Sequence, residues 1–319
     1  MTVPPTILYI TGMTRCGSTM IGNVLNEVPG AVHVGELHFL WRNGILNSGT
    51  NSTCGCGAAL AECPLWSDIS SSVDGMDMDT ARAMVSVQER RFRPRHTPAR
   101  LAESRGPLHP PADVAWATSV FAELYRAIAD RCAARVVVDG SKTPAEAAAL
   151  LGRDDLDVRV LHVVRDPRAT VFSYRLDKSY VRRKSAARSL RDWSAANLAS
   201  ELLSLRANGN YLRVRHEDVG RAPRAVIGEI MRFAGLAGAN PVDPAGRVDL
   251  GGNHTVTGNP DRLNRGPVAI RCDERWRAEL PRPARLLAAV AAGPQLLRYG
   301  YPLMARDSGA TPVDRERTS

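Results

Sequence analysis

Near its N-terminus the chain reads ILYITGMTRCGST over residues 7–19, and this stretch decides the fold. Its first four residues form a short apolar run with high β propensity, which predicts a buried strand. Gly12 and Gly17 then frame a loop with the spacing Gly-x4-Gly, and apolar residues over 20–28 recur at helical spacing. The stretch therefore predicts a strand, a glycine-containing loop and a helix, a unit whose free helical N–H groups attract phosphate.

The loop differs from a Walker A motif at the position that decides triphosphate binding. A Walker A motif has Lys directly after its second Gly, where the ammonium group reaches the β- and γ-phosphates. Here Ser18 stands at that position, and Arg15 lies two residues before Gly17. We expect the loop to bind a phosphate group but to suit a triphosphate poorly. The spacing alone also fits an ordinary tight turn, so other segments must decide.

Strands and helices alternate along the rest of the chain. Further strands are predicted at 31–34, 135–139 and 158–164, and further helices at 116–128, 144–151 and 169–176. This alternation predicts the α/β class, with a parallel sheet flanked by helices. Residues 44–113 have little periodicity and are expected to form a loop and helix insertion, with one helix near Thr80–Arg90. We expect one domain over residues 1–306 and a disordered tail over 307–319.

Composition excludes several classes of protein. The 319 residues are 44% hydrophobic and 24% charged, which is typical of globular chains and not of disordered, collagenous or membrane-spanning ones. The net charge of +9 favours an anionic partner. No long basic run and no aromatic-interleaved basic stripe occurs, so we expect no nucleic-acid partner.

The cysteines raise the question of a metal. Cys54, Cys56 and Cys63 offer three thiolates, but a closed zinc site needs four ligands and Cys-x-Cys is an unusual ligand spacing. We therefore expect loop thiols or one local disulfide, and no metal.

Targeting signals are the next question. The N-terminus lacks the basic and apolar regions of a signal peptide, and the apolar stretch 286–297 is interrupted by Gly293-Pro294. We expect a cytoplasmic chain without an integral membrane segment.

Polar residues follow the predicted strands, at the edge where ligands bind in open α/β sheets. Arg165 comes directly after the strand 158–164, and Ser173 lies two helical turns further on, so both could contact one phosphate. A polar loop at 253–266 contains Arg262 and Arg265 and has the composition of an anion-binding segment.

Three of these segments together resemble the sulfotransferases that use 3′-phosphoadenosine 5′-phosphosulfate (PAPS). Residues 14–19 are similar to the 5′-phosphosulfate loop of that family, 165–173 to its 3′-phosphate motif and 258–266 to its C-terminal cofactor loop. The three occur in the family's order, and the resemblance spans most of residues 6–305. At the position where the cytosolic small-molecule enzymes have Lys, this chain has Arg15. This difference makes the loop more similar to that of the carbohydrate and tyrosylprotein branch of the family.

The resemblance implies the sulfotransferase fold, PAPS as co-substrate and its 3′,5′-bisphosphate, PAP, as product, without a metal. It implies catalytic roles for Glu36, Lys142 and Arg15. Glu36 matches the Gly-Glu position that holds the base in the tyrosylprotein branch, and Lys142 matches the family's Lys that contacts the transferring sulfuryl group. The cofactor-binding residues that it implies are Arg15, Cys16, Gly17, Ser18, Thr19, Arg165, Ser173, Arg262, Arg265 and Gly266.

The residues agree with what sulfuryl transfer requires. A hydroxyl must lose its proton as it attacks, and charge on the leaving oxygen must be stabilised. Glu36 follows the second predicted strand and Lys142 the third. Without the resemblance, Glu36 would be interpreted as an ion-paired or helix-capping carboxylate. For Lys142 the alternative interpretation is a solvated loop residue. His33 and His38 are alternative bases.

Two other functions stay open. The first is a P-loop kinase-like phosphotransferase in which Asp139 takes the Walker B position, and the second is a non-catalytic relative that binds PAP or another anion. The acceptor is expected to be a hydroxyl on a small molecule, glycan or lipid, and sugars, lipids, phenols, natural products and peptide tyrosines all fit. The sequence leaves open whether the chain forms a homodimer.

Overall fold

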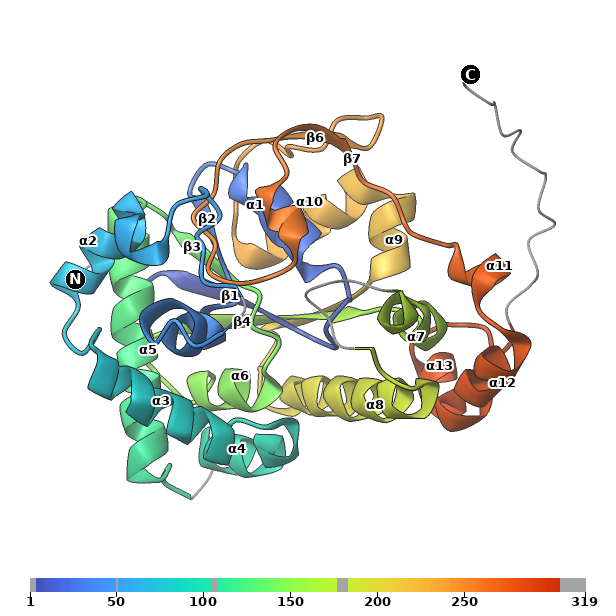
Figure 1. Cartoon of the computed structure of the whole chain (residues 1–319), viewed down its shortest axis with the longest axis horizontal. Coiled ribbons are helices and arrows are strands. Elements are labelled where there is room, and N and C mark those ends of the chain that lie inside the picture. The colour runs from blue at the N-terminus through green and yellow to red at the C-terminus, as the bar shows by residue number, and fades with distance from the viewer. Residues whose placement is uncertain (1–3, 50, 105–107, 177–182, 305–319) are drawn as a thin grey trace. The chain divides into compact units, whose positions relative to one another are not determined.

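The computed structural model describes residues 4–49, 51–104, 108–176 and 183–304, and its centre is a parallel sheet (Figure 1). The five strands are hydrogen-bonded in the order β2-β3-β1-β4-β5, and every pair is parallel. They are β1 (Thr6–Thr11), β2 (Ala31–Gly35), β3 (Val136–Asp139), β4 (Asp157–Val164) and β5 (Tyr211–Arg215). The predicted α/β class with a parallel sheet is confirmed, and the predicted tail 307–319 lies outside the described residues.

The two faces of the sheet carry separate cores. In β1, Ile7 and Tyr9 belong to one core and Leu8 and Ile10 to the other, because successive strand residues point to opposite faces. The first core contains α2 (Pro64–Ser72), α3 (Met78–Arg91), α4 (Thr97–Ser104), α5 (Ala112–Arg131) and α6 (Pro144–Leu150). The second contains α1 (Ser18–Asn26), α9 (His216–Arg221) and α10 (Pro223–Ala234). In Figure 1, α3, α4 and α6 lie on one side of the sheet and α1 and α10 on the other.

The insertion is more helical than its sequence indicates. It contains α2, α3 and α4, of which the sequence predicts only α3. Trp66, Ile69 and Leu101 of the other two helices are buried in the first core, so a few large contacts hold helices that lack a long apolar stripe. Shorter helical segments are the 3-10 helices η1 (Leu37–Phe39), η3 (Leu60–Glu62) and η4 (Pro94–His96) and the π-helix η2 (Leu40–Ile45).

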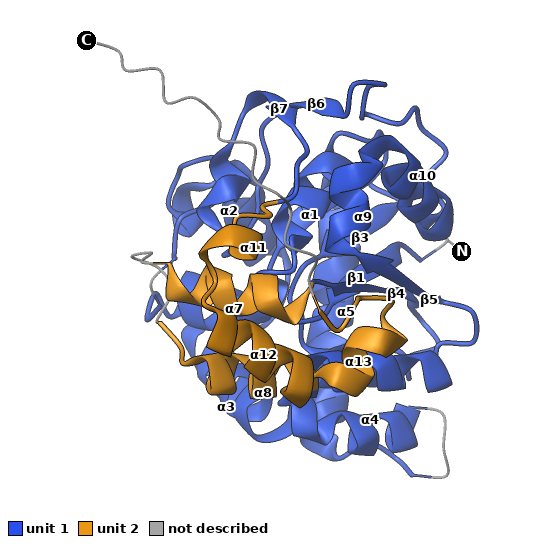
Figure 2. Cartoon of the chain, turned by 90° about the vertical axis from the view of Figure 1, so that its right-hand side faces the viewer, with its two compact units in different colours: residues 1–165, 195–272 blue, residues 166–194, 273–319 orange. Residues whose placement is uncertain are grey.

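The chain divides into two compact units, coloured blue and orange in Figure 2. Unit 1 comprises residues 1–165 and 195–272 and contains the sheet. It also contains η5 (Leu203–Leu205), η6 (Pro260–Leu263) and the antiparallel pair β6 (Arg247–Leu250) and β7 (Gly266–Ala269).

Unit 2 comprises residues 166–194 and 273–319. It contains α7 (Pro167–Arg175), the first part of α8 (Ala186–Leu202), α11 (Trp276–Glu279), α12 (Arg282–Ala291) and α13 (Gly293–Arg298). Arg168 and Asp166 form a buried ion pair of 2.7 Å there, and the Arg168 guanidinium lies 5.0 Å from the centre of the Trp276 ring. These contacts join α7 to α11. Among the described residues, the helices are all too short or too polar to cross a bilayer.

Candidate active site

The loop after β1 has the geometry of an anion-binding turn. Gly17 is the N-cap of α1 and has a φ of 94°, in the left-handed region that favours glycine. No side chain caps this helix end, so the first N–H groups of α1 keep the capacity to bind an external acceptor. Ser18 is buried and Thr19 half-buried at the start of the helix.

Arg15 and Cys16 have different roles within this loop. Arg15 has a φ of 76°, an unfavourable value for a non-glycine residue, and its carbonyl accepts a hydrogen bond from Arg165 Nη1 at 2.9 Å. Two predicted site residues from separate segments are thus in contact. The Cys16 side chain is 1% exposed and packs in the second core, and burial raises the pKa of its thiol. The Cys16 thiol is therefore not placed to bind a ligand, and the Cys16 N–H donates to Met13 O at 3.2 Å.

Lys142 lies at the carboxyl end of β3 and points to the start of α1. Its backbone N–H donates to Ile10 O at 3.1 Å, and its φ of 59° places it in the left-handed region. The Nζ atom donates to Glu36 Oε1 at 2.7 Å, to Ser18 Oγ at 3.2 Å and to Gly140 O at 2.5 Å. The three predicted residues Glu36, Lys142 and Ser18 are thus brought together, although each follows a different strand.

Glu36 owes its position to a close approach of two segments. Gly35 has a φ of 81°, and a Cβ atom there would lie 2.2 Å from Val256 O. The backbone N–H of Glu36 donates to the same carbonyl at 2.9 Å. The carboxylate is consequently held at the end of β2, beside the loop that follows β6.

The two histidines near Glu36 are held by other groups. His33 is 2% exposed, and burial together with the charges of Lys142 and Arg262 lowers its pKa to about 3. Such an imidazole is a weak base. His38 Nδ1 lies 2.7 Å from Glu146 Oε2, a fully buried carboxylate. The choice of Glu36 over His38 as the base stays a prediction.

Buried polar side chains around Asp139 and Glu146 form a hydrogen-bond network next to Lys142, which the sequence analysis did not predict. Asp139 Oδ2 accepts from Tyr125 Oη at 2.6 Å and Asp139 Oδ1 from the Ser141 N–H at 2.8 Å. Burial is the main cause that raises the pKa of Asp139 to about 6. Tyr9 Oη donates to Glu146 Oε1 at 2.8 Å. The network fixes the turn that carries Lys142, and it unites segments more than 100 residues apart, which local patterns do not reveal.

The predicted C-terminal cofactor loop contributes one wall of the site. Arg262 is 2% exposed, and its guanidinium donates to Asn51 Oδ1 at 2.7 Å and Thr53 O at 3.0 Å. Arg265 is exposed and donates to Gly55 O at 2.5 Å, so it contacts the 53–59 segment. Gly266 is the first residue of β7, which follows η6 in the sequence.

These segments enclose a small polar pocket in unit 1. The residues that carry its chemistry are Ser18, Thr19, Glu36, Lys142, Thr257 and Arg262. Arg165 belongs to unit 1, whereas Ser173 is a buried residue of α7 in unit 2. Their joint contact with one phosphate stays a prediction.

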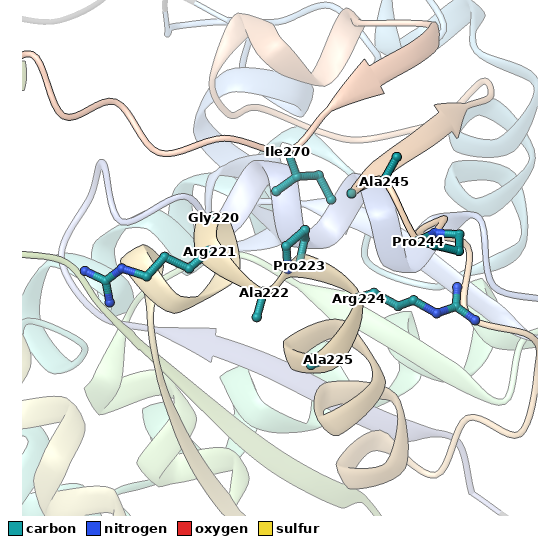
Figure 3. A pocket seen from close by; sticks show the side chains of 10 residues that line it. Gly220, Arg221, Ala222, Pro223, Arg224, Ala225, Pro244, Ala245 and Ile270 are labelled. Atoms are coloured by element: carbon teal, nitrogen blue, oxygen red, sulfur yellow. The ribbon is translucent and has the colours of Figure 1, made fainter. Parts of the chain in front are cut away.

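A larger pocket lies elsewhere in unit 1, at the junction of α9 and α10 (Figure 3). It is lined mainly by Gly, Ala and Pro residues of the segments 220–225 and 244–246. Figure 3 shows the side chains of Arg221 and Arg224 extending in opposite directions. Its lining contains none of the predicted site residues and no carboxylate.

Comparisons with known proteins show the family to which the chain belongs. The sequence model of the sulfotransferase family matches residues 5–240. Carbohydrate sulfotransferase 3 of Homo sapiens is 29% identical over 175 residues, which are 49% of this chain and 36% of that protein. Its Mus musculus counterpart is 29% identical over 174 residues, with the same two shares. The matched segment thus spans little more than a third of these relatives.

A solved structure gives the corresponding result for the fold. The sulfotransferase domain from the curacin biosynthetic pathway superposes with a TM-score of 0.52, over 95% of this chain and 100% of that one. The sequences are 16% identical, so this likeness concerns the fold alone.

Proposed function

The chain belongs to the sulfotransferase family, and from this premise we propose that it transfers the sulfuryl group of PAPS to an acceptor hydroxyl. In the reaction the acceptor oxygen forms a bond to sulfur, and the bond from sulfur to the bridging oxygen of the 5′-phosphate breaks. The products are a sulfate ester, PAP and the proton of the hydroxyl. No metal is required for this chemistry, because cationic side chains and backbone donors can stabilise the charge.

One observation carries the proposal: Lys142 Nζ lies between Glu36 Oε1 and Ser18 Oγ, at 2.7 and 3.2 Å. Ser18 begins the helix after the phosphate-type loop, so a base and a cation meet where a phosphosulfate would bind. Ser18 occupies the position of the Walker lysine, and Lys142 brings an ammonium group there from a different strand. This arrangement supports transfer from a donor with a single phosphosulfate.

The residues of the loop suit the 5′-phosphosulfate of the donor. We assign the uncapped N-terminus of α1, with Gly17, Ser18 and Thr19, to the phosphate oxygens, and Arg15 to the sulfuryl oxygens. Arg165 and Ser173 are assigned to the 3′-phosphate, as the family motif implies. Arg262 is assigned to holding the loop, since its guanidinium already donates to Asn51 and Thr53. For Arg265 and Gly266 the family motif is the sole support.

We assign the proton transfer to Glu36. Its carboxylate accepts the acceptor's proton as the hydroxyl oxygen attacks, so that no free alkoxide forms. Lys142 donates hydrogen bonds to the oxygens on which negative charge grows, with Arg15 as the second cation. For this to happen, Lys142 must exchange its contact with Glu36 for one with the donor, which frees the carboxylate for the acceptor.

The acceptor is a hydroxyl compound, and the insertion at 44–113 is our candidate for the surface that selects it, because loops near a site set specificity. The match to a protein named carbohydrate sulfotransferase 3 makes sugars the first class to test. Lipids, phenols, natural products and peptide tyrosines follow.

Thermal unfolding with nucleotides tests the donor. A ligand that binds the native state raises its stability, so PAP should raise the unfolding temperature and ATP with Mg²⁺ should not. The reverse result would favour the kinase-like alternative. Incubation with PAPS and extracts or sugar panels, followed by mass spectrometry for a gain of one SO₃, then tests the reaction. If the wild-type chain binds PAP but gives no more sulfated product than the Glu36→Gln variant, which also gives none, the non-catalytic alternative is favoured.

A further inference from the structure

Four ligand atoms from Cys54, Cys56, Cys63 and His254 lie within 4.8 Å of one another. The Nδ1 atom of His254 is 3.1 Å from Cys63 Sγ and 3.8 Å from Cys54 Sγ. The three cysteines precede α2, whereas His254 lies in the loop after β6. The histidine thus adds a fourth donor atom to the three thiols, and Cys3His is a donor set of closed structural zinc sites.

The unusual Cys-x-Cys spacing is accommodated by a tight turn over residues 53–59. The Cys54 N–H donates to Ala58 O at 2.8 Å, and the Gly57 N–H donates to Cys54 O at 2.9 Å. Thr53 and Ala59 form an antiparallel bridge across the turn. Because the chain folds back within these few residues, Cys54 and Cys56 can both contribute to one group of ligands.

We propose that Cys54, Cys56, Cys63 and His254 bind one Zn²⁺ ion as a tetrahedral structural site. Zinc bond lengths to sulfur and nitrogen place the ligand atoms of a tetrahedron about 3.5–3.8 Å apart, so the four atoms need only small movements. Thiolate and imidazole ligands favour zinc over magnesium or calcium. On binding, three thiols release their protons, His254 donates the lone pair of Nδ1, and the zinc keeps its oxidation state.

The surroundings suit the resulting charge. Three thiolates and one Zn²⁺ leave a net charge of −1. Arg265 donates to Gly55 O at 2.5 Å and Arg262 to Thr53 O at 3.0 Å, so two guanidinium groups are bonded to the turn that carries Cys54 and Cys56. Cys54 and Cys63 are fully buried, while Cys56 is exposed, which leaves the metal a route of entry.

The ion would fasten the 53–63 segment to the loop at 253–257. A backbone contact already joins them, since the Gly55 N–H donates to Thr255 O at 2.9 Å. From the following helix α2, the Trp66 side chain also donates to His254 O, at 2.7 Å. Val256 of that loop accepts the hydrogen bond of the Glu36 N–H. Zinc would therefore stabilise a wall of the pocket without contacting the reacting groups.

Metal content is the first measurement. The full chain, produced with zinc in the medium and freed of any affinity tag, should contain about one zinc per chain by elemental mass spectrometry, because four ligands bind one ion. Cys56→Ser changes an exposed side chain and should fold, yet lose most of the zinc. His254→Ala should lose it as well. Cys132→Ser removes a half-buried thiol outside the cluster and should keep the full zinc content.

A cobalt titration of the reduced, metal-free chain is the second measurement. Tetrahedral thiolate coordination should give intense visible absorption at about one equivalent, with a rise in unfolding temperature. Wild-type protein without zinc and without a cobalt band would overturn the site, as would a disulfide among the three cysteines in freshly isolated protein. Both readouts are independent of sulfuryl transfer, so failure of the proposed function would leave them unchanged.

Discussion

Lys142 Nζ lies 2.7 Å from Glu36 Oε1, and both side chains are withdrawn from water, with 5% and 17% of their surface exposed. Ion pairs with so little solvent lose much of their hydration, and removing one partner leaves the other charge poorly compensated. Lys142 has further acceptors in Ser18 Oγ and Gly140 O. A substitution that keeps the shape of Glu36 should therefore disturb chemistry more than folding.

Glu36→Gln should lower turnover by about 10²–10⁴, the usual contribution of a positioned general base. The amide keeps a hydrogen-bonding oxygen toward Lys142 but cannot accept the proton. PAP affinity should change little, which calorimetry can check alongside turnover at saturating PAPS.

The matched control is Glu123→Gln, which makes the same change on the exposed face of α5 and should leave turnover unaltered. If Glu36→Gln retains most of the wild-type turnover, the base lies elsewhere, and His38 is the next residue to test.

Lys142→Ala should lower turnover by about 10²–10³, because one lost donor to developing charge costs about 2.7–4 kcal/mol. Lys142→Arg should recover little of it. The ammonium contacts three oxygens at 2.5–3.2 Å in a nearly closed space, and a planar guanidinium cannot reproduce that geometry. Full activity of the Arg variant would indicate a role for charge alone. Lys184→Ala, in unit 2, is the control for loss of a lysine.

The sheet could be predicted from the sequence where strands are buried on both faces. β1 and β3 are largely apolar runs, and β4 is apolar apart from Asp157, Arg159 and His162; such runs are typical of parallel strands under helices. β5, Tyr211–Arg215, was missed because it is an edge strand with one fully buried residue, Val214. Its sequence is short and contains two arginines, and its apolar face consists of Leu212 and Val214 alone.

The sequence could indicate candidate site residues where they directly follow a predicted strand. Glu36 and Lys142 were singled out by the resemblance to the sulfotransferases, and their places after two parallel strands bring them to one edge of the sheet. Their catalytic roles stay predictions. Glu146 and His254 were missed because their importance arises from contacts with His38 and Cys63, at separations of 108 and 191 residues. A single histidine in a polar loop carries no local sign that it completes a cluster of thiols.

Arg165→Ala should weaken PAP binding by about 10- to 100-fold, since a charge-assisted hydrogen bond contributes roughly 1.5–3 kcal/mol. Part of the loss should come through the loop, because Arg165 Nη1 donates to the carbonyl of the strained Arg15. Calorimetry of PAP binding measures the effect. Arg82→Ala removes an exposed guanidinium from α3 and serves as control. Unchanged PAP affinity in the Arg165 variant would remove this residue from the donor site.

The last prediction concerns acid stability and His33. The pKa of this buried imidazole is lowered to about 3, chiefly by burial and then by the charges of Lys142 and Arg262. In the unfolded chain its pKa is about 6.5, so between these values the unfolded state binds a proton that the native state does not. The free energy of unfolding should therefore fall as the pH is lowered from about 7 to 5, by up to about 2 kcal/mol from this residue. His33→Gln removes that dependence, while His162, whose pKa is lowered to about 4, and Asp139 titrate in both proteins and cancel in the difference. Denaturant unfolding of wild type and variant at several pH values should give curves that converge toward acid. Parallel curves would mean that native His33 takes up its proton over the same pH range as in the unfolded chain.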